Sequence, residues 1–349
     1  MSIQFPVRPE EFEKGFVEQV FKAPSGSLQY LTHEPVGTGQ VCDSYRFTCD
    51  WKNQEGPATF IAKCPSADAK SRAAAAMFHL YDMEVGWYRD LATSSGVHCP
   101  TPFHAAIAEN KTDFVLLLSD MAPAIQGDQL AGGSLTQVRA AIKQAAKLHA
   151  FQPETALQNI SWLGHGEGNG NLLRGALPSL FEQFRPRFEH RLGPAIMDMG
   201  SELMARIPAY MDYQPAFECI AHADMRLDNI LFDQDGALAC LVDWQTVQIG
   251  TGAGDIAYLI GTSFADPAER AREEKNLLHY YVDELASHGR SLDFDALWQD
   301  YRHYAFAGLI MAINASIYVE QTERGDEMFA VMAERPAQMA LDLDSLNLL

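Results

Sequence analysis

The hydrophobic pattern of this 349-residue chain changes near residue 121, and that change limits the folds it can adopt. Before that point the apolar residues fall in short runs typical of strands, over residues 28–31, 41–49, 59–63, 103–108 and 114–118. One helical stretch, residues 68–92, interrupts the strands. We therefore expect an α+β protein whose small lobe, residues 1–120, has an antiparallel five-stranded sheet and a packed helix.

The remainder, residues 121–349, is expected to form a larger, mainly helical lobe. Helical periodicity covers residues 136–151, 172–191, 197–210, 267–287 and 294–320. One strand pair, 230–232 and 238–242, interrupts the helices and flanks Asp233-Gln234-Asp235-Gly236, a typical hairpin turn. A two-lobe chain of this kind is expected to have a cleft between its lobes.

The charge balance excludes several classes of partner. The chain carries 26 basic and 46 acidic residues, a net charge of −20. This balance argues against nucleic acid and against anionic membrane surfaces, both of which attract clustered Lys and Arg. An acidic surface suits a cationic substrate, but it also serves solubility alone.

The cysteines and the hydropathy indicate a cytoplasmic protein. None of the six cysteines forms a C-x-x-C pair, which fits reduced, buried thiols. We expect no secretory signal in the first residues, and no run approaches the ~20 apolar residues that span a bilayer. The sequence leaves the oligomeric state open.

The strongest local signal lies in residues 222–229, which read H-x-D-x-x-x-x-N, followed after the hairpin by Asp243-Trp244-Gln245. Phosphoryl transfer requires a carboxylate beside the attacking hydroxyl and oxygen ligands for Mg²⁺. Asp224 fits the base, and Asn229 and Asp243 fit the metal ligands. Asp and Asn also occur in loops for turn chemistry alone. The added D-W-Q after a hairpin makes coincidence much less probable.

The small lobe contains residues that would handle phosphates. Lys63 ends a strand, and Glu84 lies 21 residues further on, in the following helix, where it could hold the lysine by an ion pair. The turn Gly37-Thr38-Gly39 would let backbone N–H groups approach phosphates. Taken singly, Lys63 fits a solvated lysine, Glu84 fits an exposed charge on a helix, and the glycine-containing segment fits an ordinary turn. No Walker A sequence is present.

These residues resemble the aminoglycoside phosphotransferase and choline kinase superfamily, most closely its ecdysteroid-kinase-like branch, where D-W-Q or D-F-Q is usual. The resemblance extends from about Leu28 to the C-terminal helices. Tyr81-x-x-Glu84-x-x-Trp87-Tyr88 is similar to the family's small-lobe helix, and Leu148-His149-Ala150 to a large-lobe helix end. The family has a protein-kinase-like two-lobe fold.

The resemblance implies ATP and magnesium as cofactors. It implies Asp224 as base, Asn229 and Asp243 as magnesium ligands, and Lys63 on the phosphates. It implies Glu84 as the partner of Lys63. The implied phosphate loop is Gly37, Thr38 and Gly39, and the implied adenine-binding hinge is Leu118, Ser119 and Met121.

Three further residues are expected to support the site. Asp255 resembles an aspartate that braces the catalytic loop, although a helix N-cap is an equal alternative. His222 is expected to orient the loop by hydrogen bonding, or alternatively only to pack. His149 is expected to belong to the core.

Two departures distinguish the chain from protein kinases. Ala223 replaces the arginine that reads a phosphorylated activation loop, and stands where glycine is frequent in the small-molecule family. Only 11 residues separate Asp243 from Asp255, too few for an activation segment. We therefore expect a small-molecule kinase. A nucleotide-binding pseudokinase scaffold is the main rival, and a protein kinase is a third alternative.

The expected acceptor is a hydroxylated small molecule whose identity the sequence leaves open. Its specificity is expected to come from the insert at about 161–213 and from the C-terminal helices. We favour a lipophilic or steroid-like alcohol, because the ecdysteroid-kinase-like branch is the closer resemblance. An aminoglycoside or amino alcohol is the alternative.

Overall fold

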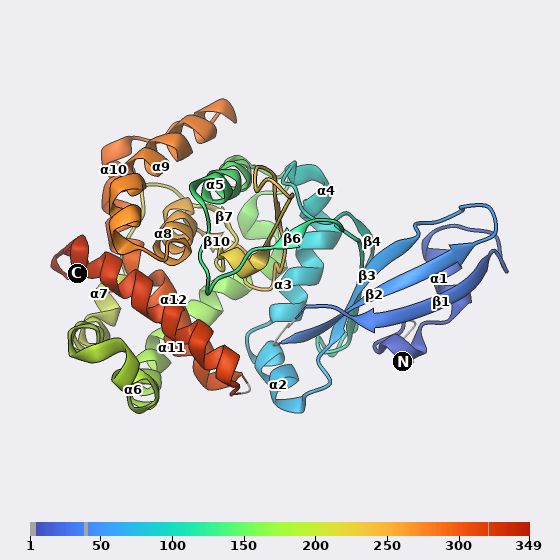
Figure 1. The fold of residues 1–349 in the computed structure, drawn as a ribbon, viewed down its shortest axis with the longest axis horizontal. Helices are drawn as coiled ribbons and strands as arrows, with labels where there is room; N and C mark the ends of the chain where they lie inside the picture. The colour runs from blue at the N-terminus through green and yellow to red at the C-terminus, as the bar shows by residue number, and fades with distance from the viewer. Residues whose placement is uncertain (1–4, 38–40, 320) are drawn as a thin grey trace. The chain divides into compact units, whose positions relative to one another are not determined.

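The computed structural model describes residues 5–37, 41–319 and 321–349. The chain forms two compact units (Figure 1). Unit 1 comprises Met1–Ser94 and Cys99–Ala122, and unit 2 comprises Ser95–His98 and Pro123–Leu349. The short segment Ser95–His98 belongs to unit 2 because His98 N–H donates to Gln144 and its carbonyl accepts from Leu241, each at 2.9 Å.

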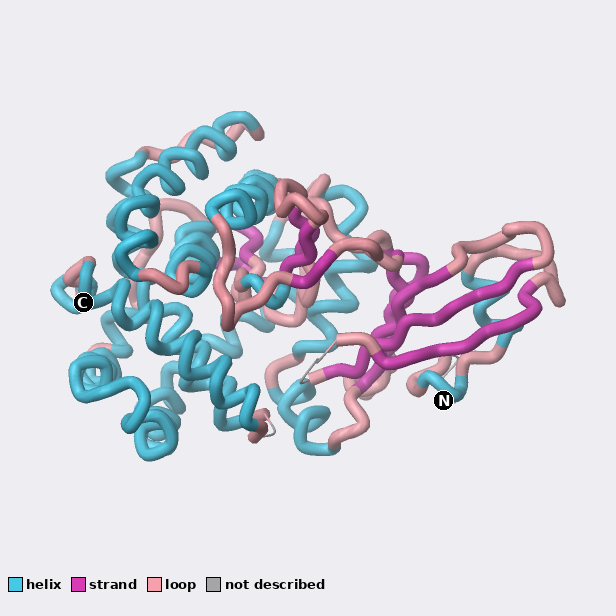
Figure 2. The backbone as a smooth tube through the Cα atoms, viewed as in Figure 1, coloured by secondary structure: helices cyan, strands magenta, loops and turns pink. Residues whose placement is uncertain are grey.

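Unit 1 contains the expected antiparallel sheet, which Figure 2 shows as magenta strands. Its five strands follow the order β1-β2-β3-β5-β4, and every neighbouring pair is antiparallel. The strands are β1 (Leu28–Pro35), β2 (Cys42–Trp51), β3 (Thr59–Pro65), β4 (Pro102–Ile107) and β5 (Phe114–Ser119). The small-lobe architecture predicted from the sequence is confirmed.

One face of this sheet is covered by the N-terminal segment, including the short helix α1 (Lys14–Val20), which the sequence pattern did not indicate. Phe47 and Phe60 stack on adjacent strands with ring centroids 5.0 Å apart, and Phe12 packs on Phe47. The Glu18 carboxylate accepts hydrogen bonds from Gly26 and Leu28, which fixes α1 to the start of β1.

The prediction of one continuous helix over residues 68–92 is wrong, because this segment is interrupted. The segment comprises α2 (Ala69–Met77), α3 (Leu80–Gly86), a π-helical turn (Trp87–Leu91) and α4 (Ala92–Ser95). His79, between α2 and α3, has a left-handed φ of +56°. No Gly or Pro marks this break, and apolar spacing continues on both sides of it, so the sequence pattern gives no sign of it.

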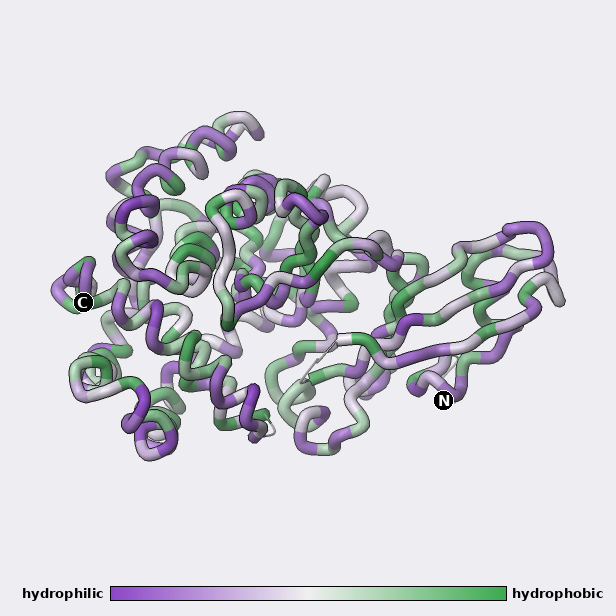
Figure 3. The backbone as a smooth tube through the Cα atoms, viewed as in Figure 1, coloured by the Kyte–Doolittle hydropathy of each residue, from purple (hydrophilic) through white to green (hydrophobic). Residues whose placement is uncertain are grey.

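Unit 2 is mainly helical, as expected. Its helices include α5 (Leu135–Ala150), α8 (Gly252–Ser263), α9 (Pro267–Ser287), α10 (Phe294–His303), α11 (Ala307–Tyr318) and α12 (Glu323–Asp342). The sequence pattern missed α8 and α12, and it joined α10 and α11 into one helix although a 3₁₀ turn, Tyr304–Phe306, separates them. Figure 3 shows hydrophilic and hydrophobic residues alternating along α9.

The insert forms a long bent helical segment. Helix α6 (His165–Ala205) is broken at Gly193, whose φ of +76° is outside the helical range, and α7 (Ile207–Met211) follows. Pro194 comes directly after Gly193, and a proline disfavours helical backbone in the residue before it. This break accounts for the two separate helical patterns predicted at 172–191 and 197–210.

Two small sheets in unit 2 hold the segment that carries the H-x-D-x-x-x-x-N motif. Strand β7 (Cys219–Ala221) pairs with β10 (Gln248–Gly250). Strand β8 (Ile230–Phe232) pairs with β6 (Ile125–Gln126) and with β9 (Ala239–Leu241), which confirms the predicted hairpin. Within the described residues, no helix combines the length and the hydrophobicity needed to cross a membrane.

Candidate active site

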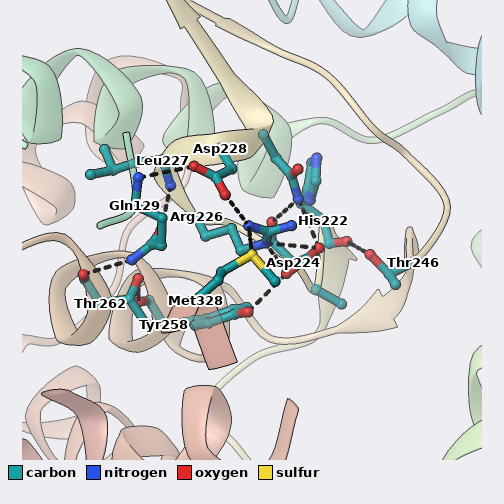
Figure 4. A network of polar contacts seen from close by, with 12 residues as sticks. Gln129, His222, Asp224, Arg226, Leu227, Asp228, Thr246, Tyr258, Thr262 and Met328 are labelled. Carbon is teal, nitrogen blue, oxygen red and sulfur yellow. Dashed lines mark hydrogen bonds and ion pairs between the residues drawn. The ribbon is translucent and has the colours of Figure 1, made fainter. Parts of the chain in front are cut away.

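Residues 222–229 form a loop between β7 and β8, and Asp224 lies at its centre (Figure 4). The Tyr258 hydroxyl donates to Oδ1 of Asp224 at 2.9 Å, and the Asn229 side-chain amide donates to Oδ2 at 2.7 Å. Each carboxylate oxygen therefore has a fixed donor, which sets the orientation of the carboxylate. The aspartate and the asparagine of the motif are thus in direct contact.

Asp255 fastens the backbone of this loop to helix α8. Its two carboxylate oxygens accept hydrogen bonds from the backbone N–H groups of His222 at 2.7 Å and Ala223 at 2.8 Å. Asp255 is not the N-cap of α8, because Thr251 occupies that position and its side chain accepts from Ala253. The bracing contact expected from the resemblance is present, and the N-cap alternative is wrong.

His149 contacts the carboxylate of Asp255 from within the core. Its Nε2 lies 3.0 Å from Oδ2 of Asp255, and its Nδ1 lies 2.8 Å from the hydroxyl of Tyr281. Both His149 and Tyr281 are fully buried. His149 is therefore a core residue, as expected, and it also orients the aspartate that holds the loop.

His222 links the loop to the D-W-Q segment. Its Nε2–H donates to the carbonyl of Val242 at 3.0 Å, because a carbonyl oxygen can only accept. Its ring lies 4.8 Å from that of Trp244, and its own carbonyl accepts from the Thr246 hydroxyl at 2.8 Å. His222 thus forms a hydrogen bond that orients the loop and also packs against Trp244, so both alternatives expected for it are present.

Two residues of the site adopt left-handed backbone conformations that side chains other than glycine rarely adopt. Ala223 has φ of +62° and Asp243 has φ of +64°. Such conformations cost about 1–2 kcal/mol each and persist only where the surroundings impose them. Here the bonds to Asp255 impose the conformation of Ala223.

Asn229 and Asp243 lie at the same end of the β8–β9 hairpin. The backbone N–H of Val242 donates to the carbonyl of Asn229 at 3.0 Å, so Asp243 directly follows the residue that pairs with Asn229. The Asn229 amide nitrogen is engaged by Asp224, which leaves the side-chain oxygen as the atom that could hold a metal ion.

One amide oxygen and one carboxylate fit Mg²⁺, which takes oxygen ligands and keeps several waters. In the described part of the chain, no three His, Cys, Asp or Glu side chains form a metal-binding cluster. The donor set thus suits a hard ion that needs few protein ligands, and it does not suit a structural transition metal.

Sequence reasoning missed two polar contacts of Asp224. Arg226 lies inside the motif, and its Nε is 3.3 Å from Oδ1 of Asp224, while its Nη1 is 2.8 Å from Oδ2 of Asp228. Tyr258 comes from α8. Arg226 occupies a position inside the motif to which no role was assigned, so the sequence already placed it near Asp224. No local pattern placed Tyr258 there.

A second set of bonds supports the far end of the loop. The backbone N–H of Gln129 donates to Oδ1 of Asp228 at 2.9 Å, and the Gln129 side chain joins the Leu227 N–H to the Thr262 carbonyl. Arg335 of α12 donates to the carbonyls of Gln129 and Thr262, each at 2.9 Å. These contacts connect α8 and α12 to the loop.

In unit 1, Lys63 of β3 and Glu84 of α3 form a buried ion pair. The Lys63 Nζ lies 2.5 Å from Oε1 of Glu84, and the Glu84 side chain has no solvent exposure. Burying a carboxylate is unfavourable unless a cation compensates it, so the pair fixes both side chains.

The other residues assigned from the sequence are placed as follows. Gly37 has a left-handed φ of +75°, while Thr38 and Gly39 lie outside the described residues. Leu118 pairs with Ile61 in the sheet. The Ser119 hydroxyl accepts from the Thr101 N–H and lies 3.5 Å from the Met121 sulfur. Their roles with a nucleotide stay predictions.

A family profile described as the phosphotransferase enzyme family matches residues 46–291, more than half of the chain. The chain belongs to this family. The match includes Lys63, Glu84, the 222–229 loop and Asp243. A search of curated proteins finds no matching relative for this phosphotransferase.

Solved structures share the fold of this phosphotransferase at low sequence identity. One from Ralstonia eutropha JMP134, provisionally described as an aminoglycoside phosphotransferase, is 16% identical with a TM-score of 0.57, covering 97% of this chain and 99% of the other. An ethanolamine kinase from Plasmodium vivax is 10% identical with a TM-score of 0.55, covering 96% and 91%.

The ternary complex of APH(2″)-IIa with streptomycin and ATP is 14% identical, with a TM-score of 0.51 over 90% of this chain and 94% of the other. At such low identity these similarities establish the kinase-like fold alone. The predicted fold class is confirmed.

Proposed function

We propose that this phosphotransferase transfers the γ-phosphoryl group of ATP to a hydroxyl group of a small molecule, with Asp224 as the base. The observation that carries the proposal is the fixed orientation of the Asp224 carboxylate between Tyr258 and Asn229. A catalytic base must be held within hydrogen-bond reach of the proton that it accepts. The kinase-like fold and the family membership supply the reaction class.

In the proposed reaction, the acceptor oxygen forms a bond to the γ-phosphorus while its proton passes to Asp224. The bond from that phosphorus to the β–γ bridging oxygen breaks, and ADP leaves with the electron pair. Asp255 keeps the loop in place through the backbone of His222 and Ala223. Because such transfers need mainly positioning and charge neutralisation, a rigid loop is the protein's main contribution.

The side-chain oxygen of Asn229 and the carboxylate of Asp243 would hold Mg²⁺. The ion, when bound, neutralises charge on the phosphate oxygens. In unit 1, Lys63 is kept in position by Glu84 and would contact the phosphates of ATP. The segments at Gly37-Thr38-Gly39 and at Leu118, Ser119 and Met121 would accommodate the phosphates and the adenine.

Two acceptor classes compete, lipophilic alcohols and amino-bearing alcohols or sugars. The lipophilic class rests on the resemblance to the ecdysteroid-kinase-like branch. The aromatic and Met residues of the insert lend it no support, because Phe181, Phe184, Phe188 and Met197 are at most 2% exposed and belong to the core. The similarity of fold to an ethanolamine kinase and to a phosphotransferase in complex with streptomycin favours testing the amino class beside it.

The test is magnesium-dependent ADP release from ATP against a panel of sterols, simple alcohols, choline, ethanolamine and aminoglycosides. The blank is Asp224→Ala, and the matched control is Asp235→Ala, which removes an exposed aspartate in the hairpin turn of the same unit. We expect one acceptor class to stimulate ADP release by the wild type and by Asp235→Ala, but not by Asp224→Ala. Equal release by Asp224→Ala would overturn the assignment of the base.

Absence of ATP binding by the wild type would overturn the kinase proposal itself. Tight binding of ATP and Mg²⁺ without turnover by any panel member would favour the pseudokinase alternative. Calorimetric titration of ATP with and without Mg²⁺ separates these outcomes.

A further inference from the structure

The guanidinium of Arg226 lies between two carboxylates of the loop, those of Asp224 and Asp228 (Figure 4). The side chain is largely buried, with 15% of its area exposed. Its contacts with the two acids differ in quality. Nη1 makes a short bond of 2.8 Å to Asp228, whereas Nε lies 3.3 Å and 3.5 Å from the two oxygens of Asp224.

Asp228 is therefore the anchor of Arg226. Its second oxygen is fixed in turn by the backbone N–H of Gln129 at 2.9 Å, so the carboxylate cannot turn away. On a further side, Nη1 of Arg226 lies 3.5 Å from the sulfur of Met328 in α12. These contacts hold the guanidinium beside the base without occupying all of its donors.

The remaining guanidinium nitrogen, Nη2, makes no hydrogen bond with any described residue. Burial alone would lower the pKa of Arg226, but the Asp224 carboxylate, Tyr258, Asp228 and Asp243 raise it above its ordinary value. Arg226 is therefore a fixed cation with unengaged donors next to the proposed base. A purely structural counter-ion would be expected to use both of its terminal nitrogens on the acids that it neutralises.

We propose that Arg226 is a catalytic residue that donates a hydrogen bond from Nη2 to a non-bridging oxygen of the phosphoryl group in transfer. This inference rests on the proposed function. Arg226 keeps its proton throughout. The acceptor oxygen bonds to phosphorus as its proton passes to Asp224, and the bridging oxygen leaves with ADP and the electron pair.

A fixed cation at this position acts where negative charge is held during transfer, and it needs no reorganisation to do so. Removal of one such preorganised donor typically lowers kcat by about 10²–10³-fold. A lysine would replace the charge but not the fork that binds Asp228 and a phosphoryl oxygen together. Arg226→Lys should thus recover only part of the rate lost in Arg226→Ala.

The experiment measures magnesium-dependent ADP release with water as the phosphoryl acceptor, so that no organic substrate has to be known. Wild type, Asp224→Ala, Arg226→Ala and Arg226→Lys are compared, with and without guanidinium chloride below denaturing concentrations. We expect Arg226→Ala to lose about 100-fold in kcat with a nearly unchanged KM for ATP. Guanidinium, but not urea, should restore part of that loss.

The matched control is Arg335→Ala. Arg335 belongs to the same network, but its hydrogen-bond partners among the described residues are the backbone carbonyls of Gln129, Leu130 and Thr262. Its loss should lower the unfolding temperature without guanidinium-dependent recovery of turnover. If Arg226→Ala behaves like this control, or turns over at the wild-type rate, Arg226 is structural and the inference is overturned.

A second measurement covers the case in which Arg226→Ala does not fold. The affinities of wild type and Arg226→Lys for ADP with Mg²⁺ are compared with their affinities for ADP, Mg²⁺ and tetrafluoroaluminate, a mimic of the phosphoryl group in transfer. Arg226→Lys should bind ADP normally and the mimic at least tenfold more weakly. Equal affinity for the mimic would overturn the inference.

The same assay separates this inference from the proposed function. Turnover by wild type and none by Asp224→Ala supports the proposed function, whatever Arg226 does. If the wild type neither binds ATP nor releases ADP above the level of Asp224→Ala, the proposed function fails and the role of Arg226 fails with it.

Discussion

The hydroxyl of Tyr258 lies 2.9 Å from Oδ1 of Asp224 and joins helix α8 directly to the loop that carries the proposed base. Burial and the neighbouring Asp224 carboxylate raise the pKa of Tyr258 well above its ordinary value. The phenol therefore stays protonated and donates to the carboxylate over the whole usable pH range. This contact makes Tyr258 a positioning residue for Asp224.

Tyr258→Phe should lower kcat by about tenfold, because a hydrogen bond to a charged group contributes about 1.5–3 kcal/mol and part of that loss is recovered by relaxation. The KM for ATP should stay close to the wild-type value. Steady-state ADP release measures both. Tyr280→Phe, which alters a partly buried tyrosine on α9, is the control, and equal effects of the two substitutions would contradict the positioning role.

Lys63→Met should destabilise the protein by about 3 kcal/mol, because it removes a cation from the fully buried Glu84 carboxylate. Adding Glu84→Gln should recover part of this loss, since the neutral amide costs less to bury. Denaturant unfolding of both single variants and the double variant measures the coupling. Additive losses in the double variant would show that the ion pair contributes no coupling energy.

Gly252→Ala tests the support behind Asp255. A Cβ at position 252 would lie 2.1 Å from the Tyr281 hydroxyl and 2.6 Å from Nδ1 of His149, both too close. We expect a loss of about 2 kcal/mol in stability, together with reduced turnover, because the His149–Asp255 contact must shift. Gly254→Ala is the control, since its Cβ would meet its nearest neighbour at 3.5 Å. Thermal unfolding distinguishes the two.

His303 should make stability depend on acid pH. Its ring is 1% exposed and stacks on Tyr213 with centroids 3.8 Å apart, and burial lowers its pKa from 6.5 to about 4. Above pH 6.5 the residue is neutral in both states and its contribution is complete. As pH falls from 6.5 towards 4, the unfolded state binds the proton first and stability declines.

The total loss from this one residue should be roughly 3–4 kcal/mol, at about 1.4 kcal/mol for each pKa unit. His303→Phe keeps a ring in the stack but cannot titrate. The difference in unfolding free energy between wild type and His303→Phe should therefore change between pH 7 and pH 4. A constant difference across that range would contradict the assignment.

The sheet of unit 1 was predictable because its strands alternate or run apolar for a few residues between clear turns. Helix α8 was not, because eleven of its twelve residues are buried and a helix buried on every side has no amphipathic period. In α12, Pro336 lies inside the helix and reads locally as a break.

The residues of the candidate site were likewise only partly predictable from the sequence. The spacing within residues 222–229 was enough to expect Asp224 and Asn229 together, and they do share a hydrogen bond. Tyr258 lies 34 residues from Asp224, and its contact depends on a helix that the pattern did not reveal. A residue brought in by tertiary packing leaves no local spacing to recognise.

The loop is attached to Asp255 through main-chain N–H groups at positions 222 and 223. Every residue except proline carries such a group, so these two hydrogen bonds do not depend on which side chain stands at position 223. Glycine there would even relieve the left-handed backbone that Ala223 adopts. A change of side chain at position 223 would therefore leave the attachment in place, whereas loss of the one carboxylate at position 255 would break both hydrogen bonds at once.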